Sequence, residues 1–141
     1  MAYLFDTDAV SELLRPSPAL PYIRWLSIIP REEQFTSAVV VGELFQGAYR
    51  SPARDRHLAN IENRILPAVT VLVYDTATAR VFGQIRAFLE HQGRRLPDSD
   101  LQIAATALYH GLIVVTGNVR HFQRVPGIKL ETILSDSRGD Q

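Results

Sequence analysis

Polar residues that directly follow predicted strands are the side chains of this sequence best placed to do chemistry. Asp6 follows the apolar run Tyr3–Phe5, and the segment Thr116-Gly-Asn118 follows the apolar run Ile113–Val115. In open parallel sheets, ligands bind beyond the carboxyl ends of the strands, because loops and helix N-termini converge there. We therefore expect Asp6 and Asn118 at one functional edge. The alternative role for Asp6 is that of a helix N-cap, which its two polar neighbours could fill equally well.

Glu43 is the second candidate because of the helical face on which it lies. On a predicted helix over residues 39–50, its neighbours include two valines and a glycine, so it is not on a freely solvated stripe. Burying this carboxylate without a partner would cost on the order of several kcal/mol, or would raise its pKa. A cation or hydrogen-bond donors would compensate for this cost, and the alternative is an ion pair with Arg50.

Asp98 and Asp100 begin the next predicted helix, over residues 101–110. Because they are two residues apart, they cannot both face one site if both are helical. Asp98 fits the N-cap position. Asp100 shares a face with small apolar residues, which lets the helix pack closely on the sheet and places Asp100 near the strand ends. The alternative is that both are surface acids favoured by the helix dipole.

Several carboxylates brought to one place raise one another's pKa unless a counter-charge is present. Oxygen ligands without Cys or a paired His motif favour Mg²⁺, with Mn²⁺ as a substitute. We predict that Asp6, Glu43 and Asp100 hold the ion, that Asn118 places water or phosphate, and that the reaction is metal-assisted hydrolysis of a phosphodiester. Surface positions are predicted for the four histidines, which are His57, His91, His110 and His121.

The elements that must position these residues alternate between strand and helix. Predicted strands cover residues 3–5, 35–37, 69–74, 113–116 and 128–130, and helical periodicity fills most of the chain between them. This alternation predicts an α/β fold: a single domain over residues 1–134 with a central, mostly parallel sheet of four to five strands, covered by helices on both faces. Residues 135–141 are predicted to form a polar, frayed C-terminal tail.

The composition is that of an ordinary globular domain: 141 residues, 46% hydrophobic and 21% charged, with 15 basic and 15 acidic residues. It excludes disorder and a basic field over the whole surface. The chain has no Cys, no export signal and no stretch of roughly 18 apolar residues, so we expect a cytoplasmic protein without a membrane segment. Arginines that could flank a nucleic-acid backbone are Arg50, Arg54, Arg56, Arg64, Arg86, Arg94 and Arg95.

Four motifs in this order resemble those of the PIN-domain ribonucleases, and within them the VapC-type toxins of bacterial toxin–antitoxin pairs. The motifs are Phe5-Asp-Thr, Val-Val-Val-Gly-Glu43-Leu, Asp100-Leu-Gln-Ile-Ala-Ala-Thr-Ala and Val-Val-Thr116-Gly-Asn-Val-Arg-His-Phe. The likeness extends from Met1 to about Leu134. It implies a Mg²⁺-dependent endoribonuclease that cleaves cellular tRNA, rRNA or mRNA and so inhibits translation and growth.

The resemblance also implies roles for individual residues. Asp6, Glu43 and Asp100 match the acidic positions of the family, and Asn118 matches the fourth, which is often Asp. Residues expected to support the site or to contact substrate are Thr7, Asp8, Asp98 and Thr116.

The partners implied by the resemblance are RNA, a second copy of the chain and a VapB-like antitoxin. The antitoxin's tail wraps the toxin and occludes the site, commonly with an Arg inserted among the acids. The expected assembly is a homodimer, and with antitoxin a heterotetramer or larger complex.

Two alternatives remain open from the sequence. One is a haloacid-dehalogenase-like phosphatase, because the segment Asp6-Thr-Asp-Ala-Val fits the start of that family's first motif. That family needs a catalytic Lys and further Asp residues downstream, and after Asn118 the chain has only Lys129, Asp136 and Asp140 of these types. The other alternative is a non-catalytic binding module of the same fold, which should take up no Mn²⁺.

Overall fold

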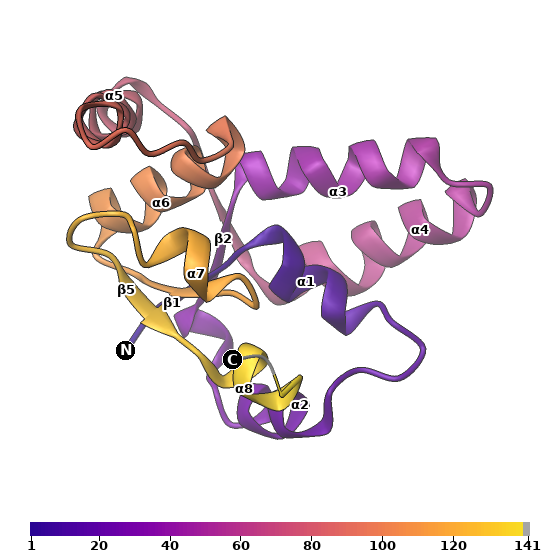
Figure 1. The fold of residues 1–141 in the computed structure, drawn as a ribbon. Helices are drawn as coiled ribbons and strands as arrows, with labels where there is room; N and C mark the ends of the chain where they lie inside the picture. Colours follow the sequence, from indigo (N-terminus) through magenta and orange to yellow (C-terminus); the bar gives the residue numbers. More distant parts are fainter. Residues whose placement is uncertain (140–141) are drawn as a thin grey trace.

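The computed structural model describes residues 1–139; Asp140 and Gln141, the end of the predicted polar tail, lie outside the described residues. Its strands form one sheet in the order β3-β2-β1-β4-β5, and every neighbouring pair is parallel (Figure 1). The predicted parallel sheet is therefore confirmed. The strands are β1 (Tyr3–Phe5), β2 (Gln34–Ser37), β3 (Thr70–Leu72), β4 (Ile113–Val115) and β5 (Lys129–Glu131).

Helices cover the sheet on both sides. In Figure 1, α3 to α6 lie on one side and α2 and α8 on the other; α5 packs against α6, α3 against α4, and α2 against α8. The helices are α1 (Thr7–Leu13), α2 (Leu20–Ser27), α3 (Ala38–Arg50), α4 (Arg54–Asn60), α5 (Thr76–His91), α6 (Asp98–His110), α7 (Val119–Phe122) and α8 (Ile133–Ser137). Short helical turns cover Arg31–Glu33, Ile61–Ile65 and Leu66–Ala68. Within residues 1–139, no helix has the length and apolar character needed to cross a membrane.

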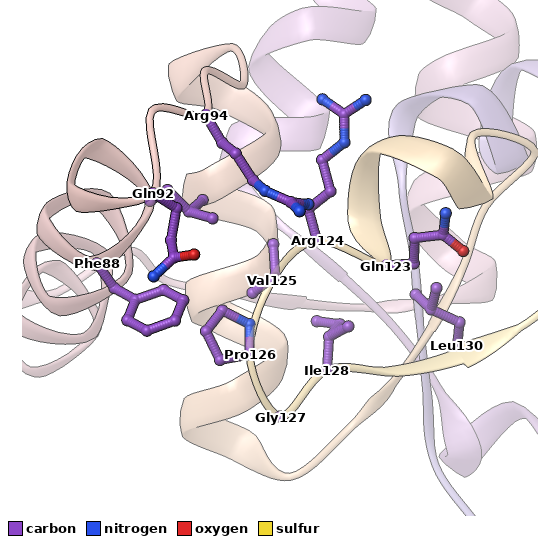
Figure 2. A pocket seen from close by; sticks show the side chains of 11 residues that line it. Phe88, Gln92, Arg94, Gln123, Arg124, Val125, Pro126, Gly127, Ile128 and Leu130 are labelled. Atoms are coloured by element: carbon purple, nitrogen blue, oxygen red, sulfur yellow. The ribbon is translucent and has the colours of Figure 1, made fainter.

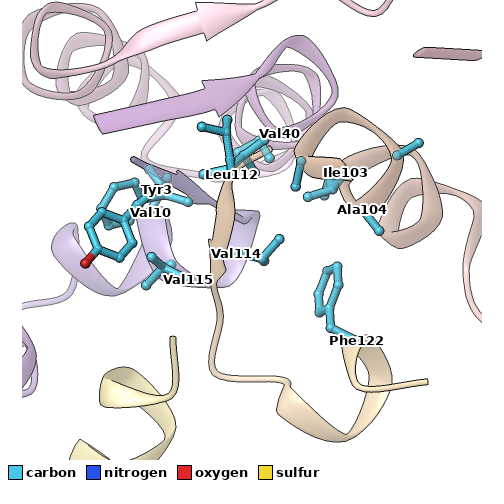
Figure 3. Packing of buried hydrophobic residues seen from close by; sticks show 14 of the residues in the cluster. Tyr3, Val10, Val40, Ile103, Ala104, Leu112, Val114, Val115 and Phe122 are labelled. Atoms are coloured by element: carbon cyan, nitrogen blue, oxygen red, sulfur yellow. The ribbon is translucent and has the colours of Figure 1, made fainter. Parts of the chain in front are cut away.

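The core is built around the two central strands, β1 and β4. Leu4 and Val114 are completely buried. Val114 points into the space between Ala104 of α6 and Phe122 of α7, while Val115 points to the opposite side, as alternate strand residues must (Figure 3). The small side chain of Ala104 lets α6 lie close to the sheet, which brings the N-terminus of α6 toward the strand ends.

The start of α6 differs from the prediction. Asp98 is not the N-cap: Pro97 takes that position without a side-chain bond, and Asp98 is the first helical residue. Its carboxylate instead pairs with Arg86 of α5, which also donates to the carbonyl of Leu96 at 3.1 Å. The ion pair with Arg86 of the neighbouring helix therefore replaces the predicted capping hydrogen bond of Asp98. At the other end, Gly111 closes α6 as predicted, with φ +68°.

The C-terminal segment is ordered by contacts, and the predicted fraying from Ser135 is wrong for the described residues. Leu134 and Ser135 of α8 are buried. The next turn places Arg138 against Asp8 and Glu12 of α1. Apolar burial and ion pairs together keep this polar segment on the body of the protein.

Candidate active site

Asp6 lies at the carboxyl end of β1 and is 4% exposed. It is the N-cap of α1, because its Oδ1 accepts a hydrogen bond from the Ala9 N–H at 2.8 Å. Thr116, buried at the end of β4, also bonds to the carboxylate of Asp6, and the Thr116 Oγ1 accepts from the Asn118 N–H at 2.8 Å. Asp6 thus caps α1 and also contacts Thr116, so it joins the polar groups that follow both central strands, β1 and β4.

The buried carboxylate of Asp6 is hard to ionise. Burial is the main reason why its pKa is raised to about 7, although hydrogen bonds from Thr116 and Ala9 oppose the shift. The negative charges of Asp8 and Asp100 raise this pKa further. A nearby cation would strongly stabilise the ionised form of this carboxyl group.

Asp100 lies in the first turn of α6, and its pKa is also raised. Burial is the main cause, a hydrogen bond and the charge of His121 oppose it, and the charge of Glu43 adds to it. Asp6, Glu43 and Asp100 come from three different parts of the fold; the charge of Asp100 raises the pKa of Asp6, and the charge of Glu43 raises that of Asp100.

Glu43 of α3 is partly buried and accepts a hydrogen bond from the Thr7 Oγ1 at 2.5 Å. Among the described residues it has no ion pair with Arg50, so that alternative is wrong. The Thr7 hydroxyl, at the start of α1, connects Glu43 to the element that Asp6 caps.

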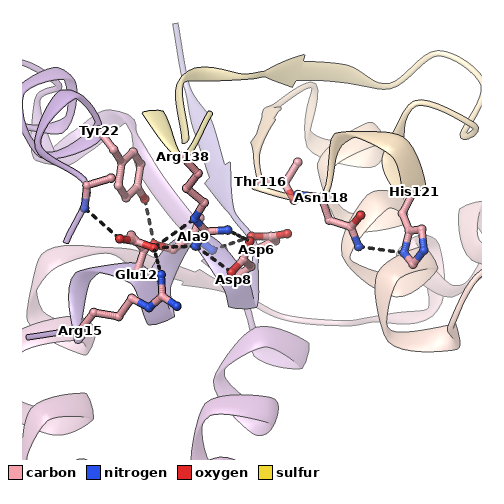
Figure 4. A network of polar contacts seen from close by, with 11 residues as sticks. Asp6, Asp8, Ala9, Glu12, Arg15, Tyr22, Thr116, Asn118, His121 and Arg138 are labelled. Carbon is pink, nitrogen blue, oxygen red and sulfur yellow. Dashed lines mark hydrogen bonds and ion pairs between the residues drawn. The ribbon is translucent and has the colours of Figure 1, made fainter. Parts of the chain in front are cut away.

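His121 belongs to this site, although its sequence context predicts a surface residue. Its Nδ1 is 2.9 Å from the Asn118 Nδ2 (Figure 4). The same nitrogen is 3.3 Å from the Asp100 Oδ2. The signal that could have revealed it is its spacing: Asn118 is the N-cap of the short helix α7, and His121 lies three residues later in its first turn, within reach of the N-cap side chain.

Asp8 and Glu12 form a second polar cluster with Arg138 beside the site (Figure 4). Arg138 donates to both Asp8 oxygens at 2.7 and 3.0 Å, and to the Glu12 Oε1 at 2.6 Å from Nη2 and 3.2 Å from Nε. Glu12 is 2% exposed and also accepts from Arg15 and from the Ala19 N–H. Burial alone would raise the pKa of Glu12, yet these donors hold it below its usual value. Glu12 and Arg138 were not among the predicted site residues.

Gly117 lies where this cluster meets the loop after β4. A Cβ at this position would collide with the Arg138 Nη1 and the Asp8 Oδ2. The absence of a side chain therefore permits the ion pair to lie against the Thr116–Asn118 backbone.

The donor set suits a hard divalent cation, because carboxylate and amide oxygens are the ligands such ions prefer and the acids repel one another without one. In the part of the chain that the structure describes, however, no three His, Asp or Glu side chains stand close enough to form a complete metal site. Asp98 lies apart from the group, because its exposed carboxylate is bound to Arg86.

Comparison with known proteins agrees with this architecture. The family model described as PIN domain matches residues 3–128. The tRNA(fMet)-specific endonuclease VapC of Shigella flexneri is 37% identical over 131 residues, covering 93% of this chain and 97% of the relative. Toxin FitB of Neisseria gonorrhoeae is 34% identical, covering 84% and 89%. The crystal structure of DNA-bound VapBC from Salmonella typhimurium superimposes with a TM-score of 0.81 at 33% identity, covering 93% of this chain and 97% of that chain.

The family match over residues 3–128 spans the positions of all four motifs, and it decides against the haloacid-dehalogenase-like alternative. The chain therefore belongs to the PIN domain family, in the group of the VapC-type ribonucleases.

Proposed function

We propose that this protein is a metal-dependent endoribonuclease that acts as the toxin of a toxin–antitoxin pair, cleaving cellular RNA and so halting translation and growth. The observation that carries the proposal is the buried Asp6 at the carboxyl end of β1: burial raises its pKa to about 7, the charge of Asp100 adds to this shift, and the charge of Glu43 acts in turn on Asp100. Membership of the PIN domain family supports the same reaction class.

We assign Asp6, Glu43 and Asp100 as the carboxylates that hold Mg²⁺, for which Mn²⁺ can substitute. When bound, such an ion would lower the pKa of the attacking water and stabilise the negative charge on the leaving oxygen. Asp6 must release its proton to serve as a ligand, and at neutral pH it is poised to do so.

The neighbouring side chains hold the proposed ligands in place. Thr7 orients Glu43, Thr116 orients Asp6, and His121 lies between Asp100 and Asn118. Asn118 is left to accept a hydrogen bond from water through its amide oxygen, or to donate to the substrate phosphate through its amide nitrogen. Asp8 contributes a supporting negative charge that Arg138 largely balances.

The proposed partner is a VapB-like antitoxin, bound to a dimer of the toxin in the cytoplasm. A cavity of about 350 Å³ beside the site is lined by Thr7, Glu43 and apolar side chains that include Leu14, Leu44 and Ile61. A partner segment lying in this cavity would reach Glu43 directly and exclude RNA from the acids.

The direct test is to incubate the purified chain with Mg²⁺ and total RNA, and to sequence the RNA ends that form. Because one relative is named for tRNA(fMet), initiator tRNA is the first defined substrate to try. Asp100→Asn should abolish cleavage and growth inhibition, whereas Asp55→Asn, which alters an exposed acid paired with Arg54, should not. Intact RNA with the wild-type chain, together with equal toxicity of Asp100→Asn, would refute the proposal.

A further inference from the structure

A groove of about 600 Å³ lies between the C-terminal end of α5 and the segment that joins α7 to β5. Figure 2 shows its 11 lining residues, none of which is acidic. Arg94 and Arg124 extend over one end, and Phe88 and Pro126 lie toward the other. Gly93 adopts φ +67° after the end of α5. In the turn that follows, the Arg94 N–H donates to the Leu89 carbonyl at 2.9 Å. This turn brings Arg94 back over the groove.

The groove carries two positive charges and no acidic lining residue. Arg94 and Arg124 are exposed, and among the described residues neither has an ion pair with a carboxylate. By contrast, Arg86 and Arg138 are each occupied by an acid. Two adjacent guanidinium groups without a counter-charge favour an anionic ligand, and a planar fork suits phosphate.

A second hollow lies between the groove and the proposed catalytic edge, and the two hollows share a lining residue. Gln123 lines both, and the second hollow also contains Gly117, Asn118 and Arg120. Helix α7 connects the two, since it begins immediately after Asn118 and ends just before Gln123. A strand of nucleic acid with one phosphate at Asn118 could therefore pass along α7 into the groove.

The groove also presents a surface for an unpaired base. The ring of Phe88 is 46% exposed, which is a large exposure for an aromatic side chain. Aromatic rings of this kind stack on bases of single-stranded nucleic acid, whereas the bases of a duplex are already stacked on one another. The side-chain amides of Gln92 and Gln123 can bond to base edges.

From these observations we infer that the groove binds a single-stranded segment of the substrate RNA next to the cleaved phosphate, with Arg94 and Arg124 on phosphates and Phe88 stacked on a base. This inference rests on the proposed ribonuclease function and names the part of the surface that would hold the substrate outside the acids.

The test measures binding separately from cleavage. The full chain carrying Asp100→Asn is titrated in EDTA against a fluorescent single-stranded RNA that contains the cleavage site, at several salt concentrations. Adding Arg94→Gln and Arg124→Gln should raise Kd roughly 10-fold and reduce the slope of log Kd against log salt by about 1.4, since each phosphate contact on a single strand contributes about 0.7. Adding Phe88→Ala should raise Kd roughly 10-fold with the salt slope unchanged.

Two exposed residues outside the groove provide matched controls. Arg80→Gln removes a charge from the other end of α5, and Tyr109→Ala removes an aromatic ring that is 50% exposed on α6. Neither should change Kd by more than about twofold, the usual span of surface substitutions. In the active chain, the groove variants should raise KM and leave kcat nearly unchanged.

The outcomes separate this inference from the proposed function. If the wild-type chain neither binds nor cuts any RNA, the proposed function fails. If it cuts RNA and the groove variants bind the single strand as tightly as the controls do, only the groove inference is overturned. A groove variant that changes the sedimentation of the chain but not its Kd for RNA would also overturn it, because the groove would then be an interface between copies.

Discussion

Arg138 donates to Glu12 across a separation of 126 residues, with the Nη2 at 2.6 Å from the Glu12 Oε1. This contact ties the C-terminal turn to the helix that Asp6 caps, beside the proposed catalytic acids. Because Glu12 is 2% exposed, its charge depends on the donors that surround it.

Arg138→Ala should lower the free energy of unfolding by about 2 kcal/mol. Breaking a fully buried ion pair costs about 3 to 5 kcal/mol, but Arg138 is partly exposed and Glu12 keeps its bonds to Arg15 and Ala19. Urea denaturation followed by circular dichroism measures the change. Arg24→Ala, at an exposed position on α2, is the matched control and should stay within about 0.5 kcal/mol of wild type. Equal stability of the two variants would show that the contact contributes nothing.

Gly117→Ala should destabilise the protein through the same ion pair, by about 1 to 2 kcal/mol, because the new methyl group displaces Arg138 from Asp8. The two substitutions should therefore be non-additive: in the presence of Arg138→Ala, Gly117→Ala should cost much less. A double-mutant cycle in urea measures this coupling. Additive effects would mean that the alanine strains something other than the Arg138 contact.

Asp6 should make the metal-free protein less stable as the pH rises. Its folded pKa of about 7 lies above the ordinary value of 3.8, so the folded state keeps a proton that the unfolded chain has already released. This contribution is fully present below about pH 4 and is lost as the pH rises through 7. The loss is at most about 4 to 5 kcal/mol, since one pKa unit corresponds to about 1.4 kcal/mol.

Asp6→Asn tests that statement, because Asn is also a good N-cap and cannot ionise. In EDTA the variant should be more stable than wild type at pH 8 and nearly equal to it at pH 4.5, while losing RNA cleavage. Unfolding curves at both pH values give the comparison. A wild-type stability that is unchanged or rises between these pH values, in parallel with the variant, would contradict the raised pKa of Asp6.

Thr7→Val should weaken divalent-ion binding roughly 10-fold, because Glu43 loses the hydroxyl that orients its carboxylate. Titration calorimetry with Mn²⁺ measures the affinity without requiring cleavage. Thr7→Ser keeps the hydroxyl and should bind Mn²⁺ like wild type. If Thr7→Val and Thr7→Ser bind the ion equally well, the hydrogen bond to Glu43 has no part in the site.

Local pattern was enough to predict much of the fold. Apolar runs predicted β1 and β4, which Asp6 and the Thr116–Asn118 segment follow, and helical periodicity predicted α3 and α6, which contain Glu43 and Asp100. These features depend on residues within a few positions of one another, and the spacing of side chains on helices and strands reports them directly. The identity of the acids as metal ligands stays a prediction.

Tertiary structure decided the pairings between distant charges. Nothing near Asp98 in the sequence indicates that Arg86 would take it from the N-cap position, and nothing near Glu12 indicates that Arg138 would order the polar C-terminal turn. His121 likewise joins the site only because the packing of α7 brings it to Asp100. The sequence by itself determined the strands, the longer helices and the acids that lie in or beside them. Which charges meet was decided by the fold, because the energy of an ion pair depends on burial and distance that only the packed chain defines.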